Sequence, residues 1–303
     1  MVAIFPNAAV TFAGPSQIAN YLHAWLIKRL GEASVSWLDQ TVQQLAESAS
    51  ERVLFTRFSA ASRQVGKADL ALTEDELEVA QTLRAGWMPG QWSIDQATRS
   101  LLLLTFPSQD ADRYVGALEK LFAAADVAEQ VALYQSLPLF PHPEKFKARA
   151  IDGLRTNITA VFNAIALHNP YAADYFEEAA WNQMVLKALF VDSRLSQIQG
   201  LDTRVNVKLA RMLSDYAHER WAAGRAVNPQ LWRSMGPLAE GDLLADFEKV
   251  LTQGELFEQQ AAALALSRAV APEAIALLDQ VPELKQAMAD DQLTWESFSV
   301  THQ

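Results

Sequence analysis

Short stripes of apolar residues at helical spacing constrain this chain more than any other feature of its sequence. One stripe is Ile18, Leu22, Trp25 and Leu26. Residues three, four and seven positions apart lie on one face of an α-helix, so this spacing predicts a helix with one buried face. A similar stripe runs from Val35 to Ala49. The repetition of such stripes predicts many short helices that pack on one another.

Helix start signals recur between the stripes. Thr73–Glu76 and Ser93–Gln96 each have the spacing of a capping box, in which the first and fourth residues satisfy each other's backbone N–H groups. Pro229 and Pro272 stand where the first residue of a helix is expected, a position that tolerates proline. These signals predict helices of ordinary length joined by short connections.

Strand signals are weak. Residues 53–58 could form a strand, but no second strand-like run or hairpin turn is available to pair with it. We therefore predict an all-α chain, built as an array of short antiparallel helix pairs in a HEAT- or armadillo-like superhelix. Since no crisp sequence repeat is visible, a compact globular helical domain is the alternative.

Composition excludes several classes of protein. The chain has 303 residues, half of them hydrophobic, so it can bury a large core. It contains no cysteine, which excludes disulfides, thiolate metal sites and a cysteine nucleophile. Its formal net charge of −11 argues against binding nucleic acid through phosphates, so no nucleic-acid partner is expected.

Targeting signals are not recognisable in the N-terminal region. No Lys or Arg precedes Lys28, whereas a secretory signal begins with a basic segment. No apolar run approaches the roughly 20 residues of a membrane-spanning helix. We expect a cytoplasmic protein without a transmembrane segment, in which any membrane contact is peripheral and made through partners.

Charge is distributed unevenly. Residues 142–236 contain 12 basic and 9 acidic residues, whereas residues 237–303 contain 3 basic and 12 acidic residues. The first block has the sign expected of an anion-binding surface, although compensation within one fold would give the same pattern. We predict a helical domain over residues 1–236 and an acidic helical extension over residues 237–303, packed on the same array.

Two predicted helices of the basic block each carry a polar line that contains an arginine. In residues 151–167 the line includes Arg155 and Asn163, and in residues 205–224 it includes Arg211, Asp215 and His218. The arginines could hold an anionic or hydroxylated molecule, and Asp215 is spaced to meet His218 on the helix. Solvated helix faces with ordinary ion pairs would show the same pattern.

The segment 175–190 leaves almost no polar face. A helix that is apolar all round is buried, so its polar groups need partners. Asn182 and Lys187 are then expected either to anchor neighbouring backbone or to line a cavity. Asp215, Glu177 or Glu178 could neutralise Lys187. The predicted ligand-binding set is Arg155, Asn163, Asn182, Lys187, Arg211, Asp215 and His218.

Familiar catalytic and metal-binding motifs are missing. His218-Glu219 begins like a metalloprotease helix, but Ala222 stands where the second histidine would be. Neither a glycine-rich phosphate loop nor a nucleophile elbow is present. The five histidines show no metal-ligand spacing. We therefore predict no metal, no cofactor and no assigned catalytic residue.

Several stretches carry a resemblance to a known family: 63–70, 153–157, 161–166, 169–171, 180–188 and 213–221. Over roughly residues 20–236 the chain resembles the EboA family, which is encoded in bacterial ebo gene clusters associated with metabolite traffic. The resemblance implies a part in moving a natural-product precursor, alongside other cluster-encoded proteins. It implies no catalytic residue.

The sequence and the resemblance together predict a non-enzymatic adaptor or carrier in the traffic of a small metabolite, acting through a polar groove, protein partners or both. One alternative is an enzyme that uses Asp215 and His218 for acid–base chemistry on a cluster metabolite. The second alternative is a pure protein-interaction scaffold, in which the acidic C-terminal third docks a basic partner.

Overall fold

The computed structural model describes residues 13–301, and it describes side chains up to Phe298. Within this range the chain is all-α: there is no strand, only an isolated antiparallel bridge between Asp69 and Ser93. Residues 53–58 are helical, which agrees with the prediction that this run does not form a strand because it has no strand to pair with. The chain forms two compact units that divide between Tyr175 and Phe176. The superhelical arrangement of the helices remains a prediction.

The first unit contains ten α-helices and three short 3₁₀ helices among its described residues. In chain order they are α1 (Pro15–Ile27), α2 (Glu32–Ser48), α3 (Glu51–Val65), α4 (Glu74–Leu83), η1 (Pro89–Gln91), α5 (Ile94–Thr105), α6 (Ala111–Ala124), α7 (Val127–Gln135), η2 (Leu137–Leu139), η3 (Pro143–Phe146), α8 (Lys147–Gly153), α9 (Thr159–Ala166) and α10 (Tyr171–Tyr175).

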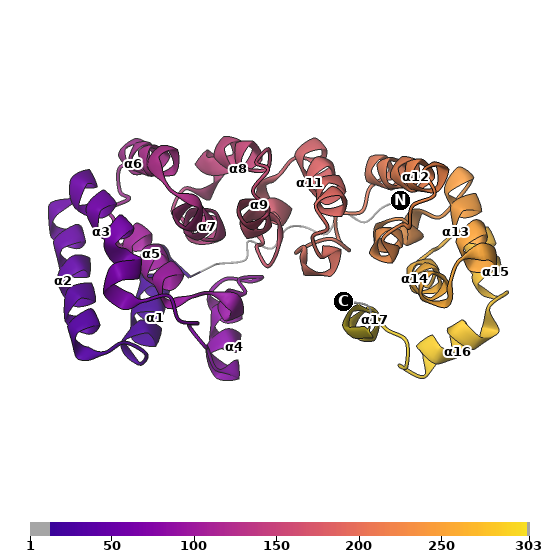
Figure 1. Ribbon diagram of the computed structural model, residues 1–303, viewed down its shortest axis with the longest axis horizontal. Coiled ribbons are helices and arrows are strands. Elements are labelled where there is room, and N and C mark those ends of the chain that lie inside the picture. Colours follow the sequence, from indigo (N-terminus) through magenta and orange to yellow (C-terminus); the bar gives the residue numbers. More distant parts are fainter. Residues whose placement is uncertain (1–12, 302–303) are drawn as a thin grey trace. The chain divides into compact units, whose positions relative to one another are not determined.

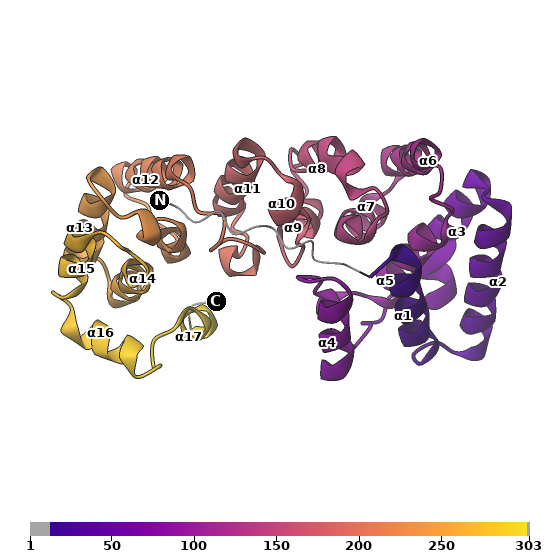
Figure 2. The same ribbon diagram turned by 180° about the vertical axis from the view of Figure 1, so that it is seen from behind.

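Helix α5 is the centre of this unit. It packs against α1, α2, α3 and α7 (Figure 2). Ile94, Asp95 and every residue from Ala97 to Leu104 are buried. Its buried charges are paired: Arg99 Nη1 donates to Asp95 Oδ2 over 2.5 Å, and Arg99 Nε donates to the carbonyl oxygen of Phe58 over 3.2 Å. The predicted capping box is present, since Ser93 N donates to Gln96 Oε1 at 2.9 Å. This pairing allows charged side chains to lie in the core of the unit.

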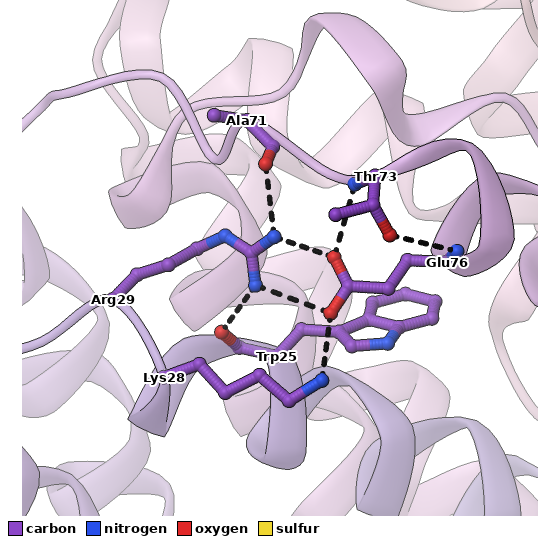
Figure 3. Close-up of polar contacts among 6 residues, drawn as sticks. All are labelled: Trp25, Lys28, Arg29, Ala71, Thr73 and Glu76. Carbon is purple, nitrogen blue, oxygen red and sulfur yellow. Dashed lines mark hydrogen bonds and ion pairs between the residues drawn. The ribbon is translucent and has the colours of Figure 1, made fainter.

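Glu76 connects α4 to the end of α1. Its carboxylate accepts from Thr73 N at 3.1 Å, which closes the second predicted capping box. It also accepts from Arg29 Nη2 at 2.5 Å and from Lys28 Nζ at 2.9 Å (Figure 3). The Arg29 guanidinium in turn donates to the carbonyl oxygens of Trp25 and Ala71, both at 2.9 Å. The cluster is therefore a structural lock between helix ends.

We expect the stability of the protein to fall in acid because of Glu76. Burial alone would raise the pKa of its carboxyl group, but hydrogen bonds from Arg29, Lys28 and Thr73 outweigh burial and lower the pKa from 4.5 to about 2. The ionised form thus stabilises the fold above the unfolded-state pKa, by about 3 kcal/mol, and this contribution is lost as the pH falls toward the folded-state pKa.

Urea unfolding at about pH 6 and about pH 3 checks this expectation. Roughly 2 kcal/mol of the Glu76 contribution should be gone at the lower pH. A Glu76→Gln variant has no ionisation to lose there, so its unfolding free energy should decline less steeply than that of the wild type. Equal declines in the two proteins would show that Glu76 does not carry the acid sensitivity.

The second unit contains seven α-helices and three 3₁₀ helices among its described residues. They are α11 (Glu178–Phe190), η4 (Leu195–Gln197), α12 (Val207–Ala222), η5 (Pro229–Ser234), η6 (Gly236–Leu238), α13 (Asp242–Gln253), α14 (Leu256–Leu266), α15 (Pro272–Leu278), α16 (Pro282–Ala289) and α17 (Trp295–Thr301). Pro229 and Pro272 open η5 and α15, as predicted for a first helical position.

Helix α14 is the core of this unit. Its residues Ala261–Leu266 are all buried, and the helix packs against η5, η6, α13, α15, α16 and α17. Figure 1 shows α14 with α13, α15 and α17 around it. Helix η5 ends at Ser234, before residue 236, and α14 begins at Leu256. Since these two helices pack together, residues on both sides of 236 share one core. The two units divide between Tyr175 and Phe176, and the described residues after 238 include helices α13–α17.

Two sequence predictions about helices need correction. Residues 151–167 do not form one helix: α8 ends at Gly153 and α9 begins at Thr159. In the gap, the Thr156 hydroxyl accepts from Ile158 N at 3.1 Å, so a side chain replaces a helical backbone acceptor. Helix α11 is not buried all round either, because Glu178 and Gln183 are exposed and Phe190 at its C-terminal end is 64% exposed.

Candidate functional site

A buried carboxylate orients an exposed histidine between α12 and α13. His218 Nε2 lies 2.5 Å from Asp246 Oδ1, and the Ser214 hydroxyl donates to Asp246 Oδ2, also at 2.5 Å. Asp246 is buried, whereas the His218 side chain is 56% exposed. The imidazole is therefore held through one nitrogen by a carboxylate and presents its other edge to solvent.

Local sequence explains how α12 presents these groups. Asn206 caps the helix, since its Oδ1 accepts from Leu209 N at 2.9 Å. Ser214 and His218 are four residues apart and thus lie on the same helical face. On α13, Asp246 precedes the fully buried Phe247, so the core contact of Phe247 brings the Asp246 carboxylate against α12.

A pocket of about 680 Å³ opens beside His218. It is bordered by α12, by the turn before α13 and by the first residues of α13, and its lining residues are Val207, Arg211, Ser214, Asp215, His218, Leu238, Glu240, Gly241, Asp242 and Leu243. We call it the α12–α13 pocket. Its volume is in the range typical of small-molecule sites, about 300–1,000 Å³.

The charges of the α12–α13 pocket are mostly negative. One permanent cation, Arg211, shares the lining with the carboxylates of Asp215, Glu240 and Asp242. Among the described residues, the side chains of Arg211 and Asp215 make no hydrogen bond or ion pair, so both can meet a ligand. This balance favours hydroxyl or amino groups on a ligand over the anion that the sequence suggested.

An aromatic surface continues from His218 along α12. The His218 ring lies 5.6 Å from the Trp221 ring, and Lys249 Nζ of α13 lies 3.8 Å from the centre of that Trp221 ring. His218, Trp221, Asp242 and Lys249 border a second, more open hollow on this side. His218 thus stands between an acidic pocket and an aromatic surface.

The predicted pairing of Asp215 with His218 is wrong. The carboxylate that meets the imidazole belongs to Asp246, which is 28 residues away in the sequence and outside the segments considered for a site. A signal was present: Asp246 stands in the apolar stripe of α13, beside Phe247 and Val250. An acidic residue in a buried stripe requires a partner, and that requirement could have directed attention to it.

Asn182 has a structural role. Its amide exchanges two hydrogen bonds with that of Asn206, at 3.0 and 2.9 Å, and so supports the residue that caps α12. The sequence suggested an anchor for neighbouring backbone or a cavity lining, whereas the observed partner is another side chain. Lys187 is half-buried on α11, and burial lowers the pKa of its ammonium group. Neither residue lines the α12–α13 pocket.

Arg155 and Asn163 belong to the first unit. Arg155 lies in the turn after α8 with a side chain that is 80% exposed, 4.0 Å from Asp152. Asn163 lies half-buried on α9. Because the helix is interrupted between them, they do not form the continuous polar line that the sequence suggested. The groove predicted to join them to Arg211 remains a prediction.

No group of three or more His, Asp or Glu side chains in residues 13–298 is arranged to hold a metal ion. None of the helices in the described range has the length and apolar character needed to cross a membrane.

The described chain is thus an all-α protein with a polar pocket on its C-terminal unit. A family model described as "Metabolite traffic protein EboA" matches residues 18–236, which is more than two thirds of the sequence. The chain belongs to the EboA family, and this confirms the resemblance seen in the sequence. No curated protein and no solved structure matches the chain. Of the site, Asp246 lies outside the matched residues and His218 lies inside them.

Proposed function

We propose that this protein is a carrier in metabolite traffic that binds a small polar molecule in the α12–α13 pocket. The main support for this proposal is that three residues of the predicted ligand-binding set line one pocket with exposed side chains. They are Arg211, Asp215 and His218. The family description supports a role in metabolite traffic. The acidic lining supports a ligand that bears hydroxyl or amino groups.

The first test is a paired substitution, Arg211→Ala with Asp215→Ala. Both side chains are exposed and form no hydrogen bond or ion pair with the residues that the structure describes, so the unfolding free energy should change by less than about 0.5 kcal/mol. Ligand affinity and metabolite traffic in cells should fall at least tenfold, which corresponds to about 1.4 kcal/mol. Glu219→Gln, an exposed change on α12 outside the lining, serves as the matched control. Normal traffic with the folded double variant would refute the site.

One observation favours a second candidate function, acid–base catalysis on a metabolite. Asp246 holds Nε2 of His218, and an imidazole that is oriented by a buried carboxylate is suited to accept a proton at its other nitrogen, Nδ1. Asp215 lines the same pocket. Lys187, another member of the predicted ligand-binding set, does not line it.

Substitution of His218 distinguishes the carrier from the enzyme. If the protein is an enzyme, His218→Gln should reduce turnover of the bound metabolite roughly a hundredfold or more. If it is a carrier, the metabolite should be recovered chemically unchanged from wild type and variant alike. Mass spectrometry of the metabolite after incubation with each protein distinguishes these results.

A further inference from the structure

Another cavity of the C-terminal unit is distinct from both the α12–α13 pocket and the hollow beside Trp221. Its volume is about 530 Å³, and its lining shares no residue with the α12–α13 pocket. The loop segment 192–194 after α11 and the following η4 form one wall, and the start of η5 continues it. Phe257 of α14 and Phe298 of α17 also line the cavity and form its aromatic wall. The cavity therefore combines one polar wall with one aromatic wall.

The loop that forms the polar wall is held in place by its backbone. Ser193 N donates to the carbonyl oxygen of Ala188 at 2.8 Å, and Ser196 N donates to Gln230 Oε1 at 2.8 Å. Asp192 has a left-handed backbone conformation, φ 56°, which aspartate tolerates better than most residues do. The side chains of this loop are thus presented from a fixed backbone.

Two opposite charges on this loop are available to a ligand. Asp192 and Arg194 are both exposed, and both line the cavity. Within the described part of the chain, neither side chain makes a hydrogen bond or an ion pair with another residue. The Arg194 guanidinium can bind a carboxylate through two parallel hydrogen bonds, and the Asp192 carboxylate can accept from an ammonium group.

The aromatic wall comes from residues beyond the family match, which ends at 236. Phe298 is 3% exposed and packs edge-on against Trp295, with ring centres 5.7 Å apart. The Arg233 guanidinium lies over that Trp295 ring at 5.2 Å, which connects α17 to η5. An apolar group in the cavity beside Phe257 and Phe298 would be removed from water against aromatic rings.

We propose that this cavity binds a small zwitterion with an apolar side chain, the chemistry of an apolar α-amino acid. Arg194 binds the carboxylate, Asp192 binds the ammonium group, and the two phenylalanine rings cover the side chain. The site goes beyond the proposed carrier function, since it uses none of the residues of the α12–α13 pocket.

Calorimetric titration of the full chain with three probes tests the proposal. The probes are L-phenylalanine, 3-phenylpropionate, which lacks the ammonium group, and phenethylamine, which lacks the carboxylate. We expect phenylalanine to bind and each analogue to bind at least tenfold more weakly. No binding of phenylalanine at millimolar concentration, or an analogue that binds as tightly as phenylalanine, would overturn the proposal.

Single substitutions locate the site. Arg194→Gln should weaken phenylalanine at least tenfold and leave phenethylamine unchanged, whereas Asp192→Asn should weaken phenylalanine and leave 3-phenylpropionate unchanged. Arg225→Gln, an exposed arginine outside the cavity, should leave phenylalanine binding as in the wild type. Unaltered phenylalanine affinity in both loop variants would show that any binding occurs elsewhere.

Discussion

Replacing Gly236 with alanine is expected to destabilise the C-terminal unit by roughly 3 kcal/mol or more. A Cβ atom at this position would lie 2.1 Å from the carbonyl oxygen of Ala265 and 2.3 Å from its carbonyl carbon. Both atoms belong to the backbone of α14, so no side-chain rotation can relieve the contact. Because α14 is the core helix of this unit, η6 would have to move away from it.

Chemical unfolding of the Gly236→Ala protein checks this expectation, with Gly116→Ala as the matched control. Gly116 lies inside α6, and a Cβ atom there would have no neighbour within 4 Å. Alanine also favours a helix interior by about 1 kcal/mol over glycine, so the control should be neutral or stabilising. Equal stability of the two variants would contradict the close approach of η6 to α14.

Glu76→Gln is expected to cost roughly 3 to 5 kcal/mol, the range found when one partner of a buried ion pair is removed. The neutral amide keeps the size of the side chain but leaves Arg29, whose side chain is only 16% exposed, without its carboxylate. It also weakens the capping box of α4, since an amide oxygen accepts less strongly than a carboxylate does.

Glu78→Gln is the control for Glu76→Gln. It removes the same charge from the same helix, but Glu78 is exposed, and the expected change is below about 0.5 kcal/mol. Urea unfolding followed by circular dichroism compares the two. A loss in Glu76→Gln no larger than that in Glu78→Gln would show that the Arg29–Glu76 contact does not stabilise the fold.

The all-α fold class and several helix ends could be predicted from the sequence because they depend on residues close together in the chain. The capping boxes at Thr73 and Ser93 and the stripe that became α12 depend on residues at most four positions apart. The interruption at residues 154–158 escaped prediction because Ile151, Leu154 and Ile158 keep helical spacing. In the structure Leu154 is buried, whereas Ile158 is 40% exposed, so the spacing there does not mark a common core face.

The site could be predicted only in part, for a related reason. Arg211, Asp215 and His218 lie on one helix, and their common face follows from spacing. Asp246 reaches His218 through the packing of α13 on α12, a tertiary contact that no local rule contains. The acidic extension was expected to pack on the same array, but its charge did not indicate that its helix α14 would be the buried core of the unit. Deleting residues 237–303 would therefore unfold the unit rather than test a docking surface, and the scaffold alternative remains a prediction.

Native mass spectrometry tests the carrier proposal most directly. The protein would be purified gently from cells that carry its gene neighbourhood, as wild type, as the Arg211→Ala and Asp215→Ala double variant, and as Glu219→Gln. We expect a retained small-molecule mass on the wild type and on Glu219→Gln, and loss of that mass from the double variant. A wild-type protein without a retained molecule, or the same mass on all three proteins, would contradict metabolite binding in the α12–α13 pocket.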